Sequence, residues 1–275
     1  MGYNFNEPCN STACGYAEMS RVSKPRPPES FVQREYRAVS KETTLVSSLV
    51  RIKDTDLQIF SERDVTEDAK ALALQYRLQI ESYIQKHPGF ERALLPLKAH
   101  ELAPAIVKDM CAAGLKTGIG PMASVAGSIA EFVGVALLKS GCREVIVENG
   151  GDVYLHRDTD ATVAIFAGDS PLSMCIGVKL KAERMPLGVC TSSGTVGHSL
   201  SFGVADSVTV ISKSTSLADS AATRLGNEVG KNLSAEAAIQ HTLELGKSIE
   251  GVDGIVVVLG DKVGAVGDVE LIRLG

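Results

Sequence analysis

Residues 187–227 form the stretch that most constrains what this chain can fold into. Apolar, β-branched runs flank a segment rich in Gly, Ser and Thr, which predicts a strand, a loop, a second strand and a helix. The loop extends as far as His198, and its first residues are Thr191, Ser192, Ser193 and Gly194. Because these side chains are short, backbone groups and hydroxyls would lie open to a ligand. We therefore expect this loop to contribute to a binding site.

A second stretch, Asn149-Gly150-Gly151-Asp152, interrupts a predicted strand that covers residues 144–155. Two glycines inside a strand indicate a bulge or the close approach of another group. Asn149 and Asp152 would then be polar anchors for a planar ring or a ribose. The alternative is a turn in which the carboxylate of Asp152 bonds to local N–H groups.

Composition narrows the classes of partner. The chain has 275 residues, enough for one large domain, with 44% hydrophobic and 22% charged residues and a net charge of -5. That charge predicts no nucleic-acid partner and no anionic membrane surface as a partner. Trp is absent and aromatic residues make up only 5%, which argues against a surface on which bases or sugars stack.

The N-terminal region predicts a flexible tail, because residues 1–30 are polar and end in a proline-rich segment. One domain over residues 31–275 would follow. The tail lacks the basic start and the apolar run of a signal peptide, and we expect no apolar stretch long enough to span a bilayer. These features predict a cytoplasmic protein.

The six cysteines are widely scattered, which in a reducing compartment favours free thiols. Cys9 and Cys14 lie in the tail, as half of a metal site, a redox pair or two unremarkable thiols. Cys190 ends an apolar strand, where it would be either inert core or a thiol activated by a nearby helix.

Strands and helices are mixed without regular alternation, so the expected fold class is α+β rather than a doubly wound parallel sheet. Thr66 is expected to cap the first helix and Ser234 the last. The expected strands lie within residues 31–60, 144–155, 162–167, 173–180, 204–212 and from 255 on, and the expected helices cover 66–87, 104–114, 129–139, 216–225 and 235–247.

Residues 117–128 carry almost only small side chains and lead into a predicted helix. Small residues at a helix N-terminus leave backbone N–H groups open, an arrangement that suits phosphate. Close packing of a helix on a sheet also demands small side chains. Composition leaves both interpretations open.

Asp219 and Thr223 lie four residues apart on a predicted helix and therefore share one face. A carboxylate and a hydroxyl make an oxygen pair suited to Mg²⁺ that is shared with phosphates. The alternative is a surface Asp beside a Thr that bonds back to its own helix. His198 could orient a phosphate, act as an acid or base, or simply bond to loop backbone.

Three runs make the pattern recognisable: GIGPMASVAG, VENGGDVYL and GVCTSSGTVGHSLSFGVADSVTV. Together with LADSAAT further on, they resemble the ApbE superfamily, and the whole chain looks most like its UPF0280 family. The resemblance implies an ApbE-like α+β domain that binds a flavin, either FAD or FMN, or another nucleotide diphosphate, with Mg²⁺. Many ApbE proteins are Mg²⁺-dependent transferases that move FMN from FAD to a protein.

The resemblance also implies roles for single residues. Asp219 and Thr223 match the superfamily's metal pair, and His198 matches its loop histidine, which makes it the candidate catalytic residue. The candidates for cofactor binding are Asn149, Gly150, Gly151, Asp152, Thr191, Ser192, Ser193 and Gly194.

The chain departs from the transferase pattern at two places. Residues 199–203 do not form the Asp-Pro-rich segment that follows the histidine in transferases, and Ala126-Gly127 are not part of a Lys-Gly-Tyr motif. We therefore expect nucleotide binding rather than FMN transfer. Whether the protein is an enzyme stays open at this point. A sulfur-handling protein that uses its thiols and a non-catalytic partner-binding protein are the alternatives. We also expect a homodimer, the commonest assembly.

Overall fold

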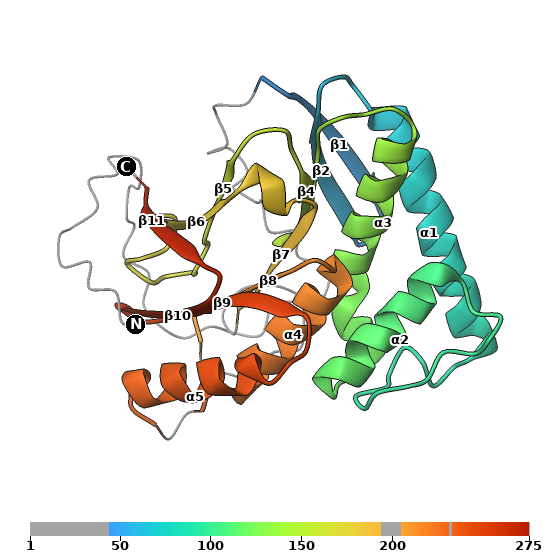
Figure 1. Cartoon of the computed structure of the whole chain (residues 1–275). Helices are drawn as coiled ribbons and strands as arrows, with labels where there is room; N and C mark the ends of the chain where they lie inside the picture. The colour runs from blue at the N-terminus through green and yellow to red at the C-terminus, as the bar shows by residue number, and fades with distance from the viewer. Residues whose placement is uncertain (1–43, 194–204, 231–232, 275) are drawn as a thin grey trace, which may run out of the picture.

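The computed structural model describes residues 44–193, 205–230 and 233–274 (Figure 1). An antiparallel sheet runs through the centre in the order β1-β2-β3-β4-β7-β8-β9-β10. Its strands are β1 (Val46–Ile52), β2 (Thr55–Ser61), β3 (Val145–Asn149), β4 (Asp152–His156), β7 (Leu187–Ser192), β8 (Ser207–Ser212), β9 (Val252–Leu259) and β10 (Lys262–Gly267).

A smaller antiparallel sheet has the order β11-β6-β5. It consists of β5 (Ala161–Ala164), β6 (Ile176–Leu180) and β11 (Glu270–Arg273). The α-helices are α1 (Thr66–Lys86), α2 (Ala105–Thr117), α3 (Val125–Lys139), α4 (Thr215–Glu228) and α5 (Ala235–Lys247). The expected α+β class is therefore confirmed.

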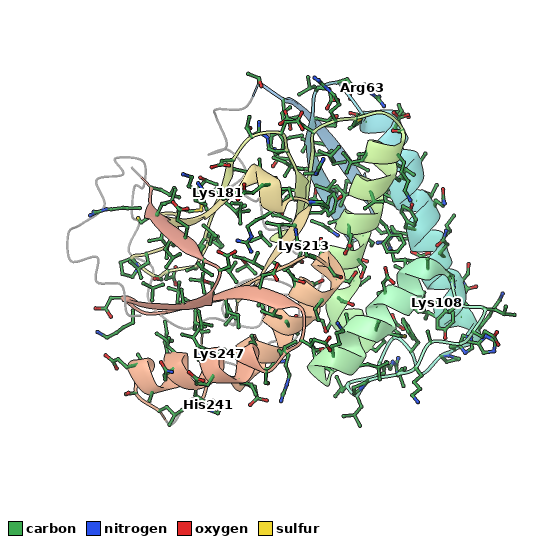
Figure 2. The ribbon with its side chains drawn as sticks, viewed as in Figure 1. Arg63, Lys108, Lys181, Lys213, His241 and Lys247 are labelled. Carbon is green, nitrogen blue, oxygen red and sulfur yellow. The ribbon has the colours of Figure 1, made fainter. Side chains whose placement is uncertain are left out.

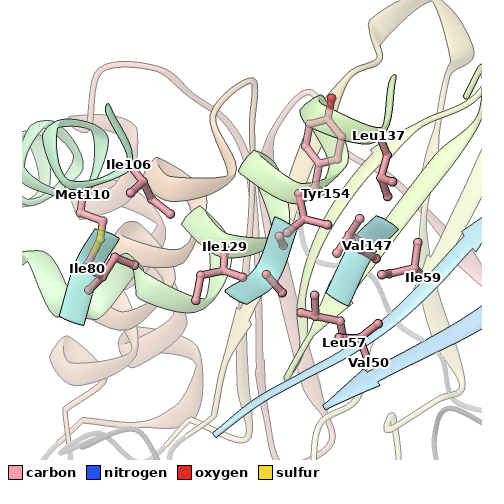
Figure 3. Close-up of a cluster of buried hydrophobic side chains, with 14 of the residues drawn as sticks. Val50, Leu57, Ile59, Ile80, Ile106, Met110, Ile129, Leu137, Val147 and Tyr154 are labelled. Carbon is pink, nitrogen blue, oxygen red and sulfur yellow. The ribbon is translucent and has the colours of Figure 1, made fainter. Parts of the chain in front are cut away.

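The two faces of the large sheet have different covers. Along β9, Ile255 and Val257 pack with α4 and α5, whereas Val256 and Val258 pack with residues of the small sheet. Neighbouring residues of a strand point to opposite faces, so β9 is buried on both sides. The other half of the sheet packs against α1, α2 and α3, and Figure 3 shows side chains of this core, including Ile59, on β2.

Several helix boundaries differ from the sequence-based expectation. Thr66 is the first residue of α1 rather than its cap, and its N–H donates to the carboxylate of Asp64 at 2.8 Å. Helix α2 continues to Thr117, because the left-handed residue that ends it is Gly118, with φ 78°, and not Gly114. The cap by Ser234 is confirmed, since its hydroxyl accepts from the N–H of Ala237.

The double glycine is not an interruption within one strand. Gly150 and Gly151, with φ of 74° and 103°, form the turn of a tight hairpin that pairs Asn149 with Asp152. Two successive residues with positive φ suit the right-handed twist of the strands, and glycine adopts that backbone without steric cost. The expected bulge is therefore a β3–β4 turn.

One helical segment of the described residues, Pro121–Lys139, has the length and apolar composition of a membrane span, with a mean hydropathy of 1.6. The expectation that no apolar run is long enough missed it, because a 3-10 turn (Pro121–Ser124) and α3 run on with only Glu131 and Lys139 charged. Half of the segment is buried inside the fold, where Val133 and Leu137 contribute to the core. Packing within the protein accounts for its apolar character.

Candidate functional site

Asp219 is buried on α4, the helix that contacts α2, α3 and the strands β7 and β8. The helix begins after Ser214, whose hydroxyl accepts from the N–H of Leu217 at 3.2 Å. Small residues on either side of Asp219, among them Ala218 and Ser220, let α4 lie close to its neighbours. A carboxylate is thereby held where three helices and the large sheet meet.

The carboxylate of Asp219 bonds to backbone at the start of α3. Its Oδ2 accepts from the N–H of Gly127 at 2.8 Å. Burial raises the pKa of Asp219 to about 7, although N–H donors from Gly127 and Ala126 act in the opposite direction. Near neutral pH this group is therefore poised between its protonated and ionised forms.

Gly127 has no room for a side chain. A Cβ there would lie 2.7 Å from the Cβ of Asp219 and 2.7 Å from the carbonyl oxygen of Thr215. The small-residue segment 117–128 thus serves close packing at this position. The N–H of Gly127 is directed at a carboxylate of the same chain, so phosphate is not its partner here.

Asn149, at the end of β3, holds the same peptide unit from the other side. Its Nδ2 donates to the carbonyl oxygen of Ala126 at 3.0 Å. The peptide that joins Ala126 to Gly127 is thus bonded to Asn149 and to Asp219. Three stretches that are far apart in the sequence therefore meet at one point.

The β3–β4 hairpin packs against β7. Gly151 donates its N–H to Glu148 Oε1 at 2.9 Å, and its carbonyl accepts from the N–H of Thr191 at 3.3 Å. Asp152 pairs with Cys190 in the register of the sheet. The hairpin turn and the end of β7 are thus fixed beside each other.

Cys190 is buried, and its thiol donates to the carbonyl oxygen of Thr215 at 3.5 Å. Burial raises the pKa of this thiol well above its usual value, and the nearby carboxylates of Asp152, Asp219 and Glu131 raise it further. A thiol in such surroundings stays protonated and unreactive at neutral pH. The activated form considered from the sequence is therefore wrong, and Cys190 is part of the core.

The remaining predicted residues lie around the same junction. Thr191 bonds to Thr209 through their hydroxyls, at 2.9 Å. Ser192 faces α4, since a Cβ at Gly226 would lie 3.2 Å from its Oγ. Ser193 follows directly on β7, and Thr223 is half-buried on α4. Gly194 and His198 lie outside the described residues.

Sequence reasoning missed Glu131, which lies on α3 and binds the N-terminus of α4. Its Oε2 accepts from the N–H of Ser216 at 3.1 Å. Burial raises the pKa of Glu131, and the N–H groups of Ser216 and Thr215 act in the opposite direction. Ser128, one turn earlier on α3, adds a hydroxyl bond to Ser216 at 2.8 Å. The sequence did hold a signal for this residue, since Glu131 is a single acidic residue within an apolar helical run.

The described side chains at this junction offer few ligands for a metal ion. Among residues 44–193, 205–230 and 233–274, no group of three or more His, Cys, Asp or Glu side chains is arranged to hold a metal ion. The labelled cations Lys108, Lys181 and Lys247 come from separate parts of the chain (Figure 2). A metal at Asp219 would need oxygen ligands from a bound molecule and from water.

Two hollows, of about 740 and 850 Å³, lie beside α1. The first is lined by α1, α2 and α3 and reaches Glu131, and the second extends along α1 to His100 and Leu102. Neither is lined by Asp219 or Asn149. We place the candidate site by its hydrogen-bonded polar groups, because these hollows are open and mostly apolar.

The fold and this junction together define an ApbE-like α+β protein. The structure is similar to the apo form of the flavinyl transferase ApbE from Pseudomonas stutzeri, with a TM-score of 0.52, 15% identity, and coverage of 81% of this chain and 94% of that one. It is equally similar to the flavin transferase ApbE from Vibrio cholerae, with a TM-score of 0.53, 13% identity, and coverage of 81% and 96%. At these identities the likeness shows the fold.

The family follows from sequence. A family model described as "AbpE bacteria" matches residues 37–264. A UPF0280 protein from Methanococcus maripaludis is 45% identical over 203 residues, 73% of this chain and 81% of that protein. Another from Methanosarcina acetivorans is 37% identical over 246 residues, 89% and 93% of the two chains. The chain belongs to the ApbE-like UPF0280 family.

Proposed function

We propose that this protein binds a flavin nucleotide, FAD or FMN, or another nucleotide diphosphate, where α3, α4, the β3–β4 hairpin and the end of β7 meet. The residues that contact the nucleotide are Asn149, Gly150, Gly151, Asp152, Thr191, Ser192, Ser193 and Gly194. The protein acts in the cytoplasm. The flavin transferases that share the fold suggest this ligand class.

The observation that carries the proposal is the peptide group between Ala126 and Gly127, which makes two side-chain hydrogen bonds. Asn149 and Asp219 hold it from two sides, and they come from two of the motifs that carry the family resemblance. A hydrogen-bonded junction of this kind fixes the backbone of three elements at once. Such rigidity is what a binding site needs if it is to be formed before its ligand arrives.

Asp219 and Thr223 are the proposed ligands of Mg²⁺. Among the described residues, no cationic side chain contributes to the pKa of Asp219, so its negative charge is buried without a counterion. A divalent cation would supply that counterion. Mg²⁺ commonly uses one or two carboxylates together with phosphate oxygens and water, and the single carboxylate at this junction fits that habit. The ion would neutralise the diphosphate on binding.

His198, outside the described residues, is the group that we assign to acid or base chemistry on the bound nucleotide. The reaction to assay for this role of His198 is FMN transfer to a protein. Cys190 does not support the sulfur-handling alternative, because its thiol is buried and its pKa is raised. Binding of a macromolecular partner alone would supply no counterion to the buried carboxylate of Asp219.

Isothermal titration of the purified protein with FAD, with Mg²⁺ and with EDTA, tests the proposal. The wild type should bind FAD in Mg²⁺ and much more weakly in EDTA. Asp219→Asn should lose roughly 2 kcal/mol or more of binding free energy in Mg²⁺, because a charged contact is lost. Thr223→Val should show a smaller loss in the same direction. In EDTA the wild type and both variants should bind about equally poorly.

The matched control is Asp160→Asn, since Asp160 also accepts from a backbone N–H, that of Ala182, but lies beside the small sheet. It should bind FAD as the wild type does. Equal affinity of the wild type for FAD in EDTA and in Mg²⁺ would refute the metal role. Absence of FAD binding under both conditions would refute the flavin assignment.

A further inference from the structure

An exposed stripe runs along the outer side of α1. Figure 1 shows this helix at the edge of the molecule, together with the segment that leads into α2. The stripe is exposed along its whole length and has the 3-4 spacing of a helix-pairing seam. Its members are Glu67, Ala71, Leu74, Leu78, Ser82 and Gln85.

The middle of the stripe is apolar. Leu74 and Leu78 are 46% and 50% exposed, and Leu102, across the 850 Å³ hollow, is 86% exposed. The helix already buries its opposite side in the core, through Ala73 and Ile80. Among the described residues, Leu74 and Leu78 belong to none of the buried core clusters. A contiguous apolar patch of this kind is typical of a protein contact surface.

The two ends of α1, at and beside the ends of the stripe, carry opposite charges. Glu67 lies in the first turn of α1 and Lys86 in the last, and both are exposed. They lie at nearly equal distances in sequence on either side of Tyr76. An antiparallel copy of the helix, centred on Tyr76, would set Leu74 against Leu78. A parallel copy would set like charges side by side, which is unfavourable.

From this self-complementary pattern we propose that a second copy of this chain docks on α1. Two α1 helices pack antiparallel about a two-fold axis near Tyr76, with Leu74 against the partner's Leu78. Glu67 of each copy then lies near Lys86 of the partner subunit. A symmetric pairing uses the same patch on both subunits, so each contact occurs twice.

A stable dimer usually buries about 800 Å² per partner. Leu102 and the hollow beside it extend the apolar area toward the start of α2. The proposed nucleotide site lies away from this surface, at the contacts of α3 and α4. The dimer therefore does not depend on the proposed function.

Sedimentation velocity on the full-length protein, over a range of micromolar concentrations, tests the dimer. The wild type should dimerise reversibly. Leu78→Glu should raise the dissociation constant by about 100-fold or more, because two apolar contacts per dimer become buried charges. Leu115→Glu is the matched control, since Leu115 is a helical leucine that is 49% exposed on α2. It should leave the dimer intact.

The register is tested by exchanging charges. Lys86→Glu should weaken the dimer about tenfold, because it sets Glu against Glu67 of the partner subunit. Adding Glu67→Lys in the same chain should return the dissociation constant to within about threefold of wild type. A wild type that is monomeric at every concentration overturns the proposal. A dimer that tolerates Leu78→Glu also overturns it, and so does one that Leu115→Glu weakens equally. A double variant that dimerises as weakly as Lys86→Glu alone overturns the antiparallel register.

Discussion

Asp219 Oδ2 lies 2.8 Å from the backbone nitrogen of Gly127 and accepts its hydrogen bond, joining α4 to the start of α3 across more than ninety residues. This bond keeps a carboxylate buried without a counterion from the described residues. It also explains why residue 127 is a glycine, since a Cβ there would clash with Asp219. The properties of this pair lead to the predictions below.

The stability of the ligand-free protein should fall as the pH rises from about 4 to about 7. The pKa of Asp219 is 3.8 when solvated and about 7 in the fold, so the folded state binds the proton more tightly. Stability is fully present below the unfolded pKa and is lost as the pH passes through the folded pKa, at up to about 1.4 kcal/mol per pH unit.

Urea unfolding of wild type and Asp219→Asn across this range measures the effect. The variant cannot ionise, so its stability should depend less on pH, and it should be the more stable protein near pH 8. Glu131, whose pKa is also raised by burial, gives a residual slope of the same sign. Equal slopes in the two proteins would show that Asp219 is ionised throughout.

Gly127→Ala should lower the free energy of unfolding by about 1–3 kcal/mol, because the added methyl overpacks the contact with α4. Nucleotide binding should weaken as well. Gly89→Ala is the control, because nothing lies within 4 Å of a Cβ at Gly89. Chemical denaturation of both variants makes the comparison, and equal stabilities would contradict the close packing at Gly127.

Asn149→Asp should destabilise the protein by roughly 1–3 kcal/mol, because it replaces the donor to Ala126 with an acceptor in a buried place. The variant should gain stability as the pH is lowered and the new carboxyl is protonated. Denaturation at two pH values measures both effects. A pH-independent loss would mean that only packing, and not the hydrogen bond, was disturbed.

Cys190 should not react with a thiol reagent in the native protein. Its pKa is raised well above the usual value and its side chain is buried. Native wild type and Cys190→Ala should therefore expose equal numbers of reactive thiols, whereas in urea the wild type should show one more. A native wild type that shows one more reactive thiol than native Cys190→Ala would reverse this assignment.

How much could be predicted from sequence is best judged at particular elements. The α+β class and most helices followed from periodicity, because a repeated apolar pattern marks the buried side of an element. The hairpin at Gly150-Gly151 did not, since two glycines are compatible with a bulge as well as with a turn. The end of α2 was misjudged for the same reason, because either Gly114 or Gly118 could have ended it.

The sequence by itself determined the family, through the runs around Ala126, Asn149, Thr191 and Asp219, because these local patterns are written in consecutive residues. It also determined that Asp219 and Thr223 share one helical face. Only the tertiary structure decided that Asp219 bonds to Gly127, because that contact depends on how α3 and α4 pack. Burial is likewise a property of the whole fold. It raises the pKa of Asp219 and, together with nearby carboxylates, it makes Cys190 inert.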